Sequence, residues 1–186
     1  MEYDPERERD RRIRIRAAVQ EIADLPLYIS DRTGITTQGM LSELRRLRTT
    51  RKVDMVIVDY LQLAKGVGKF GTRAEEVASI SRGLKGIAME LGVPVIALSQ
   101  FHRDSAKEGR EPELHDLKES SGIEQDANLV LMIHFTRMYD VLAGVDTGDC
   151  KLLIRKNRSG PVGWMPLQFT APTGIFREIE GDRSEA

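Results

Sequence analysis

Two polar residues stand directly after apolar runs in the middle of the sequence. Asp59 follows the run 55–58, and Gln100 follows the run 93–98 after a single serine. Ligands of open α/β sheets bind outside the carboxyl ends of the strands. There a carboxylate can orient Mg²⁺ on a nucleotide, and an amide can sense a γ-phosphate or the water that attacks it. The pair indicates a nucleotide site. Because apolar runs that end in a polar residue are common, the alternative is an ordinary sheet edge that binds no ligand.

Three cations precede a rigid turn in the last third of the chain. Arg155, Lys156 and Arg158 come just before the Ser-Gly-Pro segment 159–161. Cations grouped at such a turn can bind an anion, and an arginine there can reach a phosphate across a subunit boundary. The alternative is a surface hairpin whose charges are solvated.

The glycine-rich segment 66–71 matches the dinucleotide pattern G-x-G-x-x-G but lacks its context. No acidic residue ends the following strand to bind a ribose, because Gln100 stands there. Phe70 follows the Gly-Lys pair where a phosphate-binding P-loop needs serine or threonine. We interpret the segment as a loop that either tracks a nucleic-acid backbone or is an ordinary connection.

Composition excludes several classes of protein. The chain has 186 residues, of which 40% are hydrophobic and 31% charged, as expected for a globular domain with its own core. Cys150 is the single cysteine, which excludes an internal disulfide and fits a reducing compartment, and we expect it to be buried and inert. The apolar runs are shorter than the ~18 residues that a membrane span needs, so no membrane association is expected. The net charge of -1 means that a nucleic-acid site would have to be local.

The middle of the chain predicts a βαβ unit. Apolar runs at 55–58 and 93–98 flank a helical pattern at 75–91 that Gly92 closes. Runs that are apolar at every position predict strands buried on both faces. Before this unit, the pattern predicts a helix that begins near Ile13 and a second helix whose N-cap is Thr37. A short strand is expected between these two helices, at 27–29.

The rest of the chain is expected to be mainly strands. A short helix is expected around 114–117, and the strands that follow are predicted at 129–135, 151–155, 164–170 and 175–179. Turn-rich spacing indicates that the last three pair antiparallel.

Four segments resemble the C-terminal motor domain of DnaB-type replicative DNA helicases. They are VDYLQL at 58–63, SRGLKGIAMELGVPVIALSQ at 81–100, LKESSGIEQDANLVLMI at 117–133 and IRKNRSGPVG at 154–163. The resemblance extends from about Pro26 to Glu178. It implies an α/β fold with a RecA-like P-loop NTPase core, whose mostly parallel sheet carries antiparallel strands at the C-terminal end and is incomplete at the N-terminal side. It also implies ATP and Mg²⁺ as cofactors, a hexameric ring as the homo-oligomer, and single-stranded DNA and other replication proteins as partners.

The resemblance also implies a role for each matching residue. Asp59 is expected to hold Mg²⁺, and Gln100 to couple the γ-phosphate to the DNA-binding loops. Lys156 and Arg158 are expected to reach the ATP of the neighbouring subunit, Arg158 as an arginine finger. The DNA-binding loop is expected at Lys118, Glu119, Ser121 and Gly122.

The sequence departs from the family pattern in two respects. Lys118 stands where the family usually has arginine, and glycine comes one place later than usual, at Gly122. The Walker A loop and the catalytic glutamate of the family lie upstream of the matching region and are absent from this sequence. We therefore expect that this chain alone does not hydrolyse ATP at a useful rate. Asp59, Gln100 and Arg158 are expected along one rim of the sheet, around a triphosphate shared with an adjoining copy.

The expected organisation is a charged helical extension at 1–25, a partial motor domain at 26–180 and a tail at 181–186, in a cytoplasmic protein that takes part in unwinding duplex DNA. Two other functions stay open. One is a non-catalytic, helicase-derived module that binds a helicase ring or single-stranded DNA. The other is a recombinase-like RecA-fold ATPase, which the segment 120–128 and the basic pair at 156 and 158 disfavour. A nicotinamide enzyme is disfavoured by the missing ribose acid.

Overall fold

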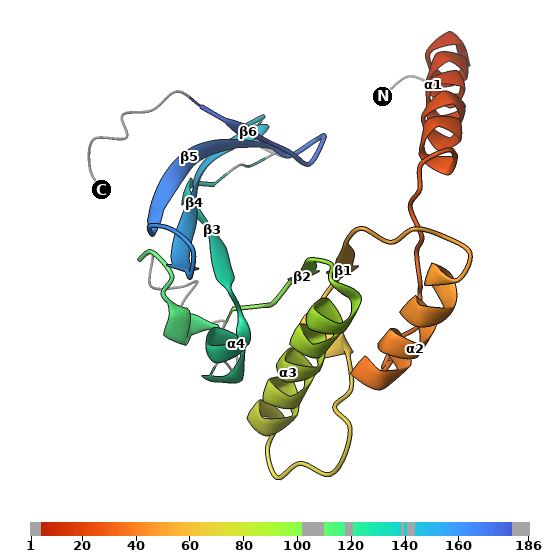
Figure 1. Cartoon of the computed structure of the whole chain (residues 1–186). Helices are drawn as coiled ribbons and strands as arrows, with labels where there is room; N and C mark the ends of the chain where they lie inside the picture. Colours follow the sequence, from red (N-terminus) through yellow and green to blue (C-terminus); the bar gives the residue numbers. More distant parts are fainter. Residues whose placement is uncertain (1–4, 102–109, 118–120, 139, 141–143, 180–186) are drawn as a thin grey trace. The chain divides into compact units, whose positions relative to one another are not determined.

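The computed structural model describes residues 5–101, 110–117, 121–138, 140 and 144–179 (Figure 1). The chain divides into two compact units, Met1–Arg32 and Thr33–Ala186. None of the described helices has the length and apolar character that crossing a membrane requires.

The first unit contains one helix, α1 (Pro5–Ala23). Proline suits the first helical position because its missing N–H would have no partner there, and Glu6 and Glu8 complement the positive end of the helix dipole. The helix buries none of its residues. The short strand predicted at 27–29 is wrong: Leu27 and Ile29 lie outside any strand and are exposed. A three-residue run needs a neighbouring strand to satisfy its backbone, and the described part of this unit offers none.

The second unit begins with two capped helices, α2 (Thr37–Arg48) and α3 (Arg73–Leu91). The Thr36 hydroxyl accepts a hydrogen bond from the Gly39 amide and caps α2, one residue before the expected cap. Thr72 caps α3 in the same way, and Gly92 ends it in the left-handed conformation, with φ of 65°. The helix predicted at 75–91 is therefore confirmed, with two additional residues at its start.

The described strands form two sheets. Strand β1 (Val56–Val58) precedes α3 in the chain and strand β2 (Val95–Ala97) follows it. The two strands pair in parallel, which completes the predicted βαβ unit. Four antiparallel strands follow in chain order: β3 (Leu129–Arg137), β4 (Thr147–Asn157), β5 (Gly163–Thr170) and β6 (Ile175–Glu178). The α/β class and the antiparallel C-terminal strands are confirmed. The short helices η1 (Leu61–Leu63), η3 (Leu114–Asp116) and α4 (Ser121–Asp126) connect these parts.

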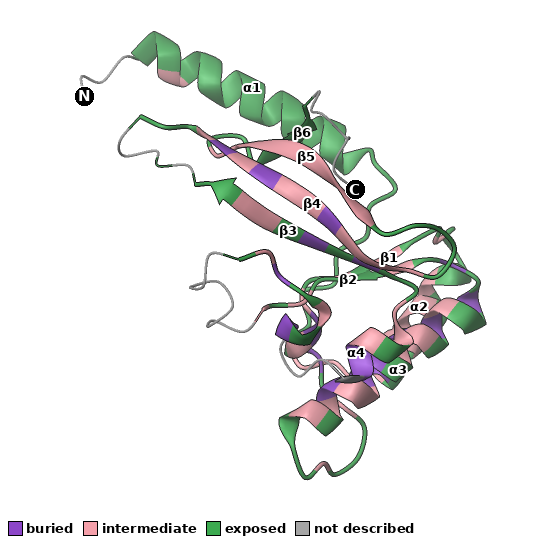
Figure 2. Ribbon diagram, turned by 90° about the vertical axis from the view of Figure 1, so that its left-hand side faces the viewer, coloured by how far each residue is buried: buried purple, intermediate pink, exposed green. Residues whose placement is uncertain are grey.

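The core lies between α3 and one face of each sheet. Val77, Ile80 and Ile87 of α3 are almost fully buried, as are Met132 of β3 and Leu153 of β4. These residues belong to one apolar cluster, and Figure 2 shows the buried positions of the antiparallel sheet on β3 and β4. Their helical and alternating spacings explain why these side chains face the same interior.

The expectation that the apolar strands are buried on both faces is wrong. Ile57 of β1 is 62% exposed and Ile96 of β2 is 47% exposed, whereas Val56, Val58 and Val95 pack against the core. Strand β3 alternates in the same way, with an exposed set at Leu129, Leu131 and Ile133. Strands β1, β2 and β3 thus pack one side on the core and leave apolar side chains on the other side exposed, whereas the residues of β4 and β5 are buried or half-buried.

Candidate functional site

Asp59 and Gln100 lie at the carboxyl ends of neighbouring strands. Val58 is paired with Ala97 in the parallel ladder, and the Leu98 amide donates a hydrogen bond to the Val58 carbonyl at 3.0 Å. Both predicted site residues lie just beyond these positions, and both are exposed. Among the described residues, no hydrogen bond or ion pair engages the Asp59 carboxylate, which leaves its oxygens open to a ligand.

Gln62 links the two strand ends and is not among the residues that the sequence predicts for the site. Its amide nitrogen Nε2 donates to the Ser99 hydroxyl at 2.9 Å, and the Arg73 guanidinium donates to its backbone carbonyl at 2.6 Å. Its carbonyl oxygen Oε1 is buried without a hydrogen-bond partner among the described residues. The polar residue Gln62, three places after Asp59, was the available signal, since it interrupts the apolar pattern within the 3₁₀ turn.

The glycine-rich loop is closed by carboxylates rather than open to a phosphate. The amide of Gly66 donates to Glu76 at 3.1 Å, and the amide of Gly71 donates to Glu75 at 2.8 Å. The Gly66 hydrogen bond, supported by Arg73, holds the pKa of the Glu76 carboxyl below its ordinary value. The rejection of a dinucleotide cradle is supported, because two of the amides such a cradle would use are already satisfied.

The predicted basic pair lies against the last turn of α4. Lys156 donates to the Glu124 carbonyl, and Arg158 donates to the Gln125 carbonyl at 2.7 Å. Lys85 of α3 donates to the next carbonyl, that of Asp126, at 2.8 Å. Three successive carbonyls at the negative end of a helix thus each receive a cation, which is favourable on electrostatic grounds.

The three groups expected along one rim do not share one sheet. Asp59 and Gln100 follow the two-stranded parallel sheet, whereas Arg158 follows β4 of the antiparallel sheet. The expectation of one rim is therefore wrong for the described strands. The physical reason is that no described strand bridges β2 and β3, so the sheet, which was expected to be incomplete, is divided into two.

Only part of the predicted DNA-binding loop falls within the described residues. Lys118 and Glu119 lie outside them, and Ser121 begins α4. Gly122 is buried where α4 meets α3, and a Cβ atom at this position would lie 2.4 Å from the Cβ of Ala78. Close helix packing is therefore a sufficient reason for glycine at this position.

Replacing Gly122 by alanine is expected to destabilise the fold by about 1–3 kcal/mol, because the added methyl overlaps the backbone and side chain of Ala78. Chemical denaturation monitored by circular dichroism measures the change. Gly86→Ala is the matched control, since a Cβ atom there meets nothing within 4 Å and alanine favours the helix interior. Equal stability of the Gly122 variant and the wild type would contradict the packing role.

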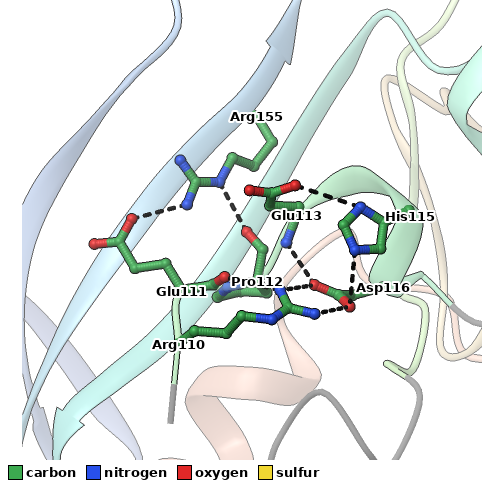
Figure 3. A network of polar contacts seen from close by, with 7 residues as sticks. All are labelled: Arg110, Glu111, Pro112, Glu113, His115, Asp116 and Arg155. Carbon is green, nitrogen blue, oxygen red and sulfur yellow. Dashed lines mark hydrogen bonds and ion pairs between the residues drawn. The ribbon is translucent and has the colours of Figure 1, made fainter. Parts of the chain in front are cut away.

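The segment that leads into this loop is tied to β4 by a polar network (Figure 3). Arg155 donates to the Glu111 carboxylate and to the Pro112 carbonyl, both at 2.8 Å, and Lys151 donates to Glu111 at 2.8 Å. The cations at 155, 156 and 158 were expected either to bind an anion or to be solvated, and the anion that Arg155 binds is Glu111 of the same chain. This network fixes the position of the backbone at residues 111–112, before the predicted loop.

An ion pair between half-exposed Arg110 and buried Asp116 lies beside these contacts. Arg110 donates two hydrogen bonds of 2.7 Å to the carboxylate of Asp116, whose side chain is only 6% exposed. Asp116 also accepts the Glu113 amide at 2.8 Å, which caps η3. His115 lies within ion-pair distance of both Glu113 and Asp116.

The contacts of Glu111 predict acid sensitivity. The hydrogen bond from Lys151, followed by that from Arg155, holds the pKa of the Glu111 carboxyl below its ordinary value of 4.5. A lowered folded-state pKa stabilises the fold above the unfolded value, and this stabilisation is lost as the pH falls through the folded value. Glu111→Gln is therefore expected to lower the melting temperature at pH 7 and to flatten its decline between about pH 5 and pH 3. Thermal melts across this range test the prediction, with Glu21→Gln on exposed α1 as the control. Parallel pH profiles for wild type and Glu111→Gln would contradict it.

Cys150 is buried, as expected, and burial raises the pKa of its thiol. A protonated thiol is a poor nucleophile and a poor metal ligand. The described residues contain no cluster of three histidine, cysteine or acidic side chains that could hold a metal by itself. A Mg²⁺ ion held by one carboxylate together with waters and phosphate oxygens does not require such a cluster, so Asp59 fits that kind of site.

Comparison with known proteins shows that the chain is similar to one protein family. The model of the DnaB-like helicase C terminal domain matches residues 5–178, a range that includes α1 and begins before Pro26. The replicative DNA helicase DnaB of Rickettsia felis (strain ATCC VR-1525 / URRWXCal2) is 33% identical over 184 residues, which cover 90% of this chain and 37% of the relative. The chain therefore spans little more than a third of that protein.

Two solved structures are also similar. One is an ATPase domain, here called the reference ATPase domain, with a TM-score of 0.76 and 34% identity, over 88% of this chain and 58% of that chain. The other is a DnaB-like replicative helicase, described with its primase interactions, with a TM-score of 0.74 and 32% identity, over 88% of this chain and 41% of that chain.

Proposed function

This chain belongs to the DnaB-like helicase C-terminal domain family, and we propose that it is part of an ATP-driven motor that unwinds duplex DNA during replication by moving along single-stranded DNA. The observation that carries the proposal is the pair of exposed polar side chains, Asp59 and Gln100, at the carboxyl ends of two strands in one parallel ladder. That is where nucleotides bind in sheets of this kind.

Asp59 is the proposed magnesium ligand. Its carboxylate is exposed, and the backbone before it is fixed by the β1–β2 ladder, so its position is set without its own oxygens being used. When bound, Mg²⁺ would neutralise charge on the phosphates of ATP. Gln100 would contact the γ-phosphate or the attacking water, and the Gln62–Ser99 hydrogen bond holds the preceding residue in place.

Lys156 and Arg158 are proposed to reach the ATP of an adjoining subunit in a hexameric ring. Their hydrogen bonds to α4 use backbone carbonyls and leave no carboxylate paired with either cation among the contacts described. Exchange of a carbonyl for a phosphate oxygen is favourable for a guanidinium, which binds phosphate in a bidentate manner. Arg158 is exposed and would serve as the arginine finger.

Single-stranded DNA is the proposed ligand of Lys118, Glu119, Ser121 and Gly122. The Arg155–Glu111 network supports this placement, because it anchors the chain before residue 118. The start of α4 anchors the chain after residue 120.

The proposal is tested by joining this chain behind the phosphate-loop half of a DnaB-like motor, a protein that we call the joined motor. ATP hydrolysis dependent on Mg²⁺ and stimulated by single-stranded DNA is expected from the joined motor, and no turnover is expected from this chain alone. A folded, ring-forming joined motor that does not hydrolyse ATP would contradict the proposal. Turnover by the isolated chain, abolished in Asp59→Ala, would show that the expected dependence on the other half is wrong.

Binding of single-stranded DNA is expected to weaken steeply with salt. Each phosphate contact contributes a slope of about -0.7 to the dependence of log affinity on log salt concentration. Lys118→Ala is expected to reduce the steepness of this dependence by about one phosphate contact. Fluorescence anisotropy of a labelled oligonucleotide between low and moderate salt measures both quantities. Salt-insensitive binding, or an unchanged slope in Lys118→Ala, would contradict the assignment.

A non-catalytic module that docks on a helicase ring is the second candidate function. The exposed apolar side chains of β1, β2 and β3 favour it, since they offer surface for association with another polypeptide. Stable association with an intact motor subunit, together with an inactive joined motor, would support this alternative.

A further inference from the structure

Strand β4 holds the chain on both sides of the predicted DNA-binding loop. On the upstream side, Arg155 donates to the carboxylate of Glu111 at 2.8 Å. On the downstream side, Lys156 and Arg158 donate to backbone carbonyls in the last turn of α4. The cations at one end of a single strand thus fix the segment before residue 118 and the helix that follows residue 120.

Glu111 is the centre of the upstream attachment. Each of its two carboxylate oxygens accepts one hydrogen bond of 2.8 Å, one from Lys151 and the other from Arg155. The three side chains are between 28% and 35% exposed, so water screens their charges only in part. The hydrogen bond from Lys151, followed by that from Arg155, holds the pKa of the Glu111 carboxyl below its ordinary value, which keeps it ionised at neutral pH. One carboxylate therefore contacts β4 at two positions.

A break in the strand register places Arg155 at this contact. The register of the β3–β4 ladder shifts between Val130 and Leu131, and Arg155 is the residue of β4 that has no partner on β3 there. An extra residue of this kind bends the strand and redirects its side chain, and such irregularities are frequent beside functional sites. Figure 3 shows the Arg155 side chain extended toward Glu111 and the carbonyl of Pro112, to which it also donates at 2.8 Å.

An acid so close in sequence to a DNA-binding loop needs a reason. A carboxylate repels phosphates, and Glu111 also occupies two cations that could otherwise bind them. The net charge of the chain is -1, so a DNA site depends on cations gathered locally. The contacts of Glu111 give that reason, because they attach the polypeptide to a strand of the core.

We propose that Glu111 is a positioning residue for the DNA-binding loop, which it attaches to β4 through Arg155 and Lys151. Arg155 acts as the partner of Glu111 in this arrangement and is not itself a phosphate ligand. The attachment rests on the contacts above, whereas the choice of DNA as the ligand of the loop rests on the proposed function. The loss of this acid is therefore expected to weaken the binding of single-stranded DNA, although the chain becomes more positive.

Substitution of Glu111 separates positioning from simple electrostatics, because the two predict opposite changes. Glu111→Gln removes a negative charge and releases two cations, so electrostatics alone predicts tighter binding of single-stranded DNA. Loss of the attachment predicts weaker binding, by about threefold or more, a size found for residues in direct contact. Fluorescence anisotropy of a labelled oligonucleotide with the full 186-residue chain measures the affinity, at a temperature where circular dichroism shows each variant to be folded.

A second substitution keeps the charge constant. Glu111→Asp shortens the side chain by one methylene, so it cannot reach both cations as glutamate does, and an intermediate loss of affinity is expected. This variant also provides the test if Glu111→Gln does not fold. The double variant of Glu111→Gln with Arg155→Gln is expected to bind DNA as weakly as either single variant, since both changes remove the same attachment.

Hydrogen exchange tests the attachment without DNA. The amides of Asp116 and Leu117 donate to carbonyls within η3, and their exchange is expected to quicken in Glu111→Gln because this turn is no longer held on β4. Glu90→Gln is the matched control. It removes an acid that pairs with Arg45 at 2.6 Å between α3 and α2, outside the proposed site, so unchanged exchange and unchanged DNA affinity are expected.

Binding in Glu111→Gln that equals or exceeds that of the wild type would overturn the inference, and so would unchanged exchange of the η3 amides. A wild-type chain that binds no single-stranded DNA would instead refute the DNA assignment of the proposed function, and the exchange measurement would still decide the attachment. Tighter binding by Glu111→Gln, in a chain whose wild type shows the expected salt dependence, would refute this inference alone.

Discussion

Arg158→Ala is expected to lower ATP turnover of the joined motor by a factor of about 10³–10⁵, the contribution that arginine fingers make to phosphoryl transfer. The guanidinium would stabilise charge that develops on the transferred phosphoryl group, and alanine leaves that charge without its cation. Because Arg158 binds only backbone carbonyls in the described contacts, its replacement is expected to lower the rate of ATP hydrolysis and to leave folding unchanged. Phosphate release at saturating ATP, with single-stranded DNA present, measures the effect.

Arg177→Ala is the matched control, because Arg177 is an exposed arginine on β6 outside the proposed site. Its turnover is expected to equal that of the wild type. Arg158→Lys should recover little activity, since a point charge cannot replace a planar, bidentate donor. Wild-type turnover in Arg158→Ala would contradict the assignment of Arg158 as the arginine finger.

Mixing two inactive variants distinguishes a finger that acts across subunits from one that acts within its own. In a ring assembled from equal amounts of Asp59→Ala and Arg158→Ala subunits, about a quarter of the interfaces contain both functional groups if assembly is random. Turnover above that of either variant is expected. Asp54→Ala replaces Asp59→Ala in the control mixture, because Asp54 is exposed and ion-paired with Lys52 at the other end of β1. No gain despite verified subunit exchange would contradict action in trans.

Leu153→Ala is expected to destabilise the second unit by about 2–5 kcal/mol, the range for truncating a fully buried leucine. The side chain is 0% exposed and belongs to the apolar cluster that joins β4 to α3 and β3. Since small domains have a net stability of only about 5–15 kcal/mol, this loss is a large share of the total. Urea denaturation followed by circular dichroism measures it.

Leu27→Ala is the control for this truncation, since Leu27 is 55% exposed and lies outside the core cluster. A change within about 0.5 kcal/mol is expected for this surface position. Equal losses in the two variants would show that the α3-centred cluster is not the stabilising core of the chain.

Local signals were sufficient for helices α2 and α3 and for the βαβ unit, but not for α4 or for the start of α1 at Pro5. Thr72 and Gly92 bound α3 through hydrogen bonds and backbone conformations that depend on nearby residues, and such features can be read from residue type and spacing. The positions of Asp59 and Gln100 followed from the same unit, because parallel strands place their carboxyl ends together. The antiparallel hairpins were likewise predictable from the turns between them.

Partners distant in sequence could not be predicted. Glu111 pairs with Arg155 across 44 positions, and Lys156 meets the Glu124 carbonyl across 32, so neither contact has a local signature. The same limitation applies to Gly122, whose surroundings are set by the approach of Ala78 from another helix. The predicted strand at 27–29 failed for a related reason, since a strand exists only where a neighbouring edge accepts its hydrogen bonds.

By itself, the sequence determined the apolar alternation, the caps and the residues that end each strand, because these depend on chemistry within a few residues along the chain. Only the tertiary structure decided where the described strands separate into two sheets, that Arg158 follows a different sheet from Asp59 and Gln100, and that apolar side chains of β1 and β3 stay exposed. Periodicity records which side chains are apolar, but burial requires a second surface to remove them from water, and the presence of that surface is a property of the assembled fold.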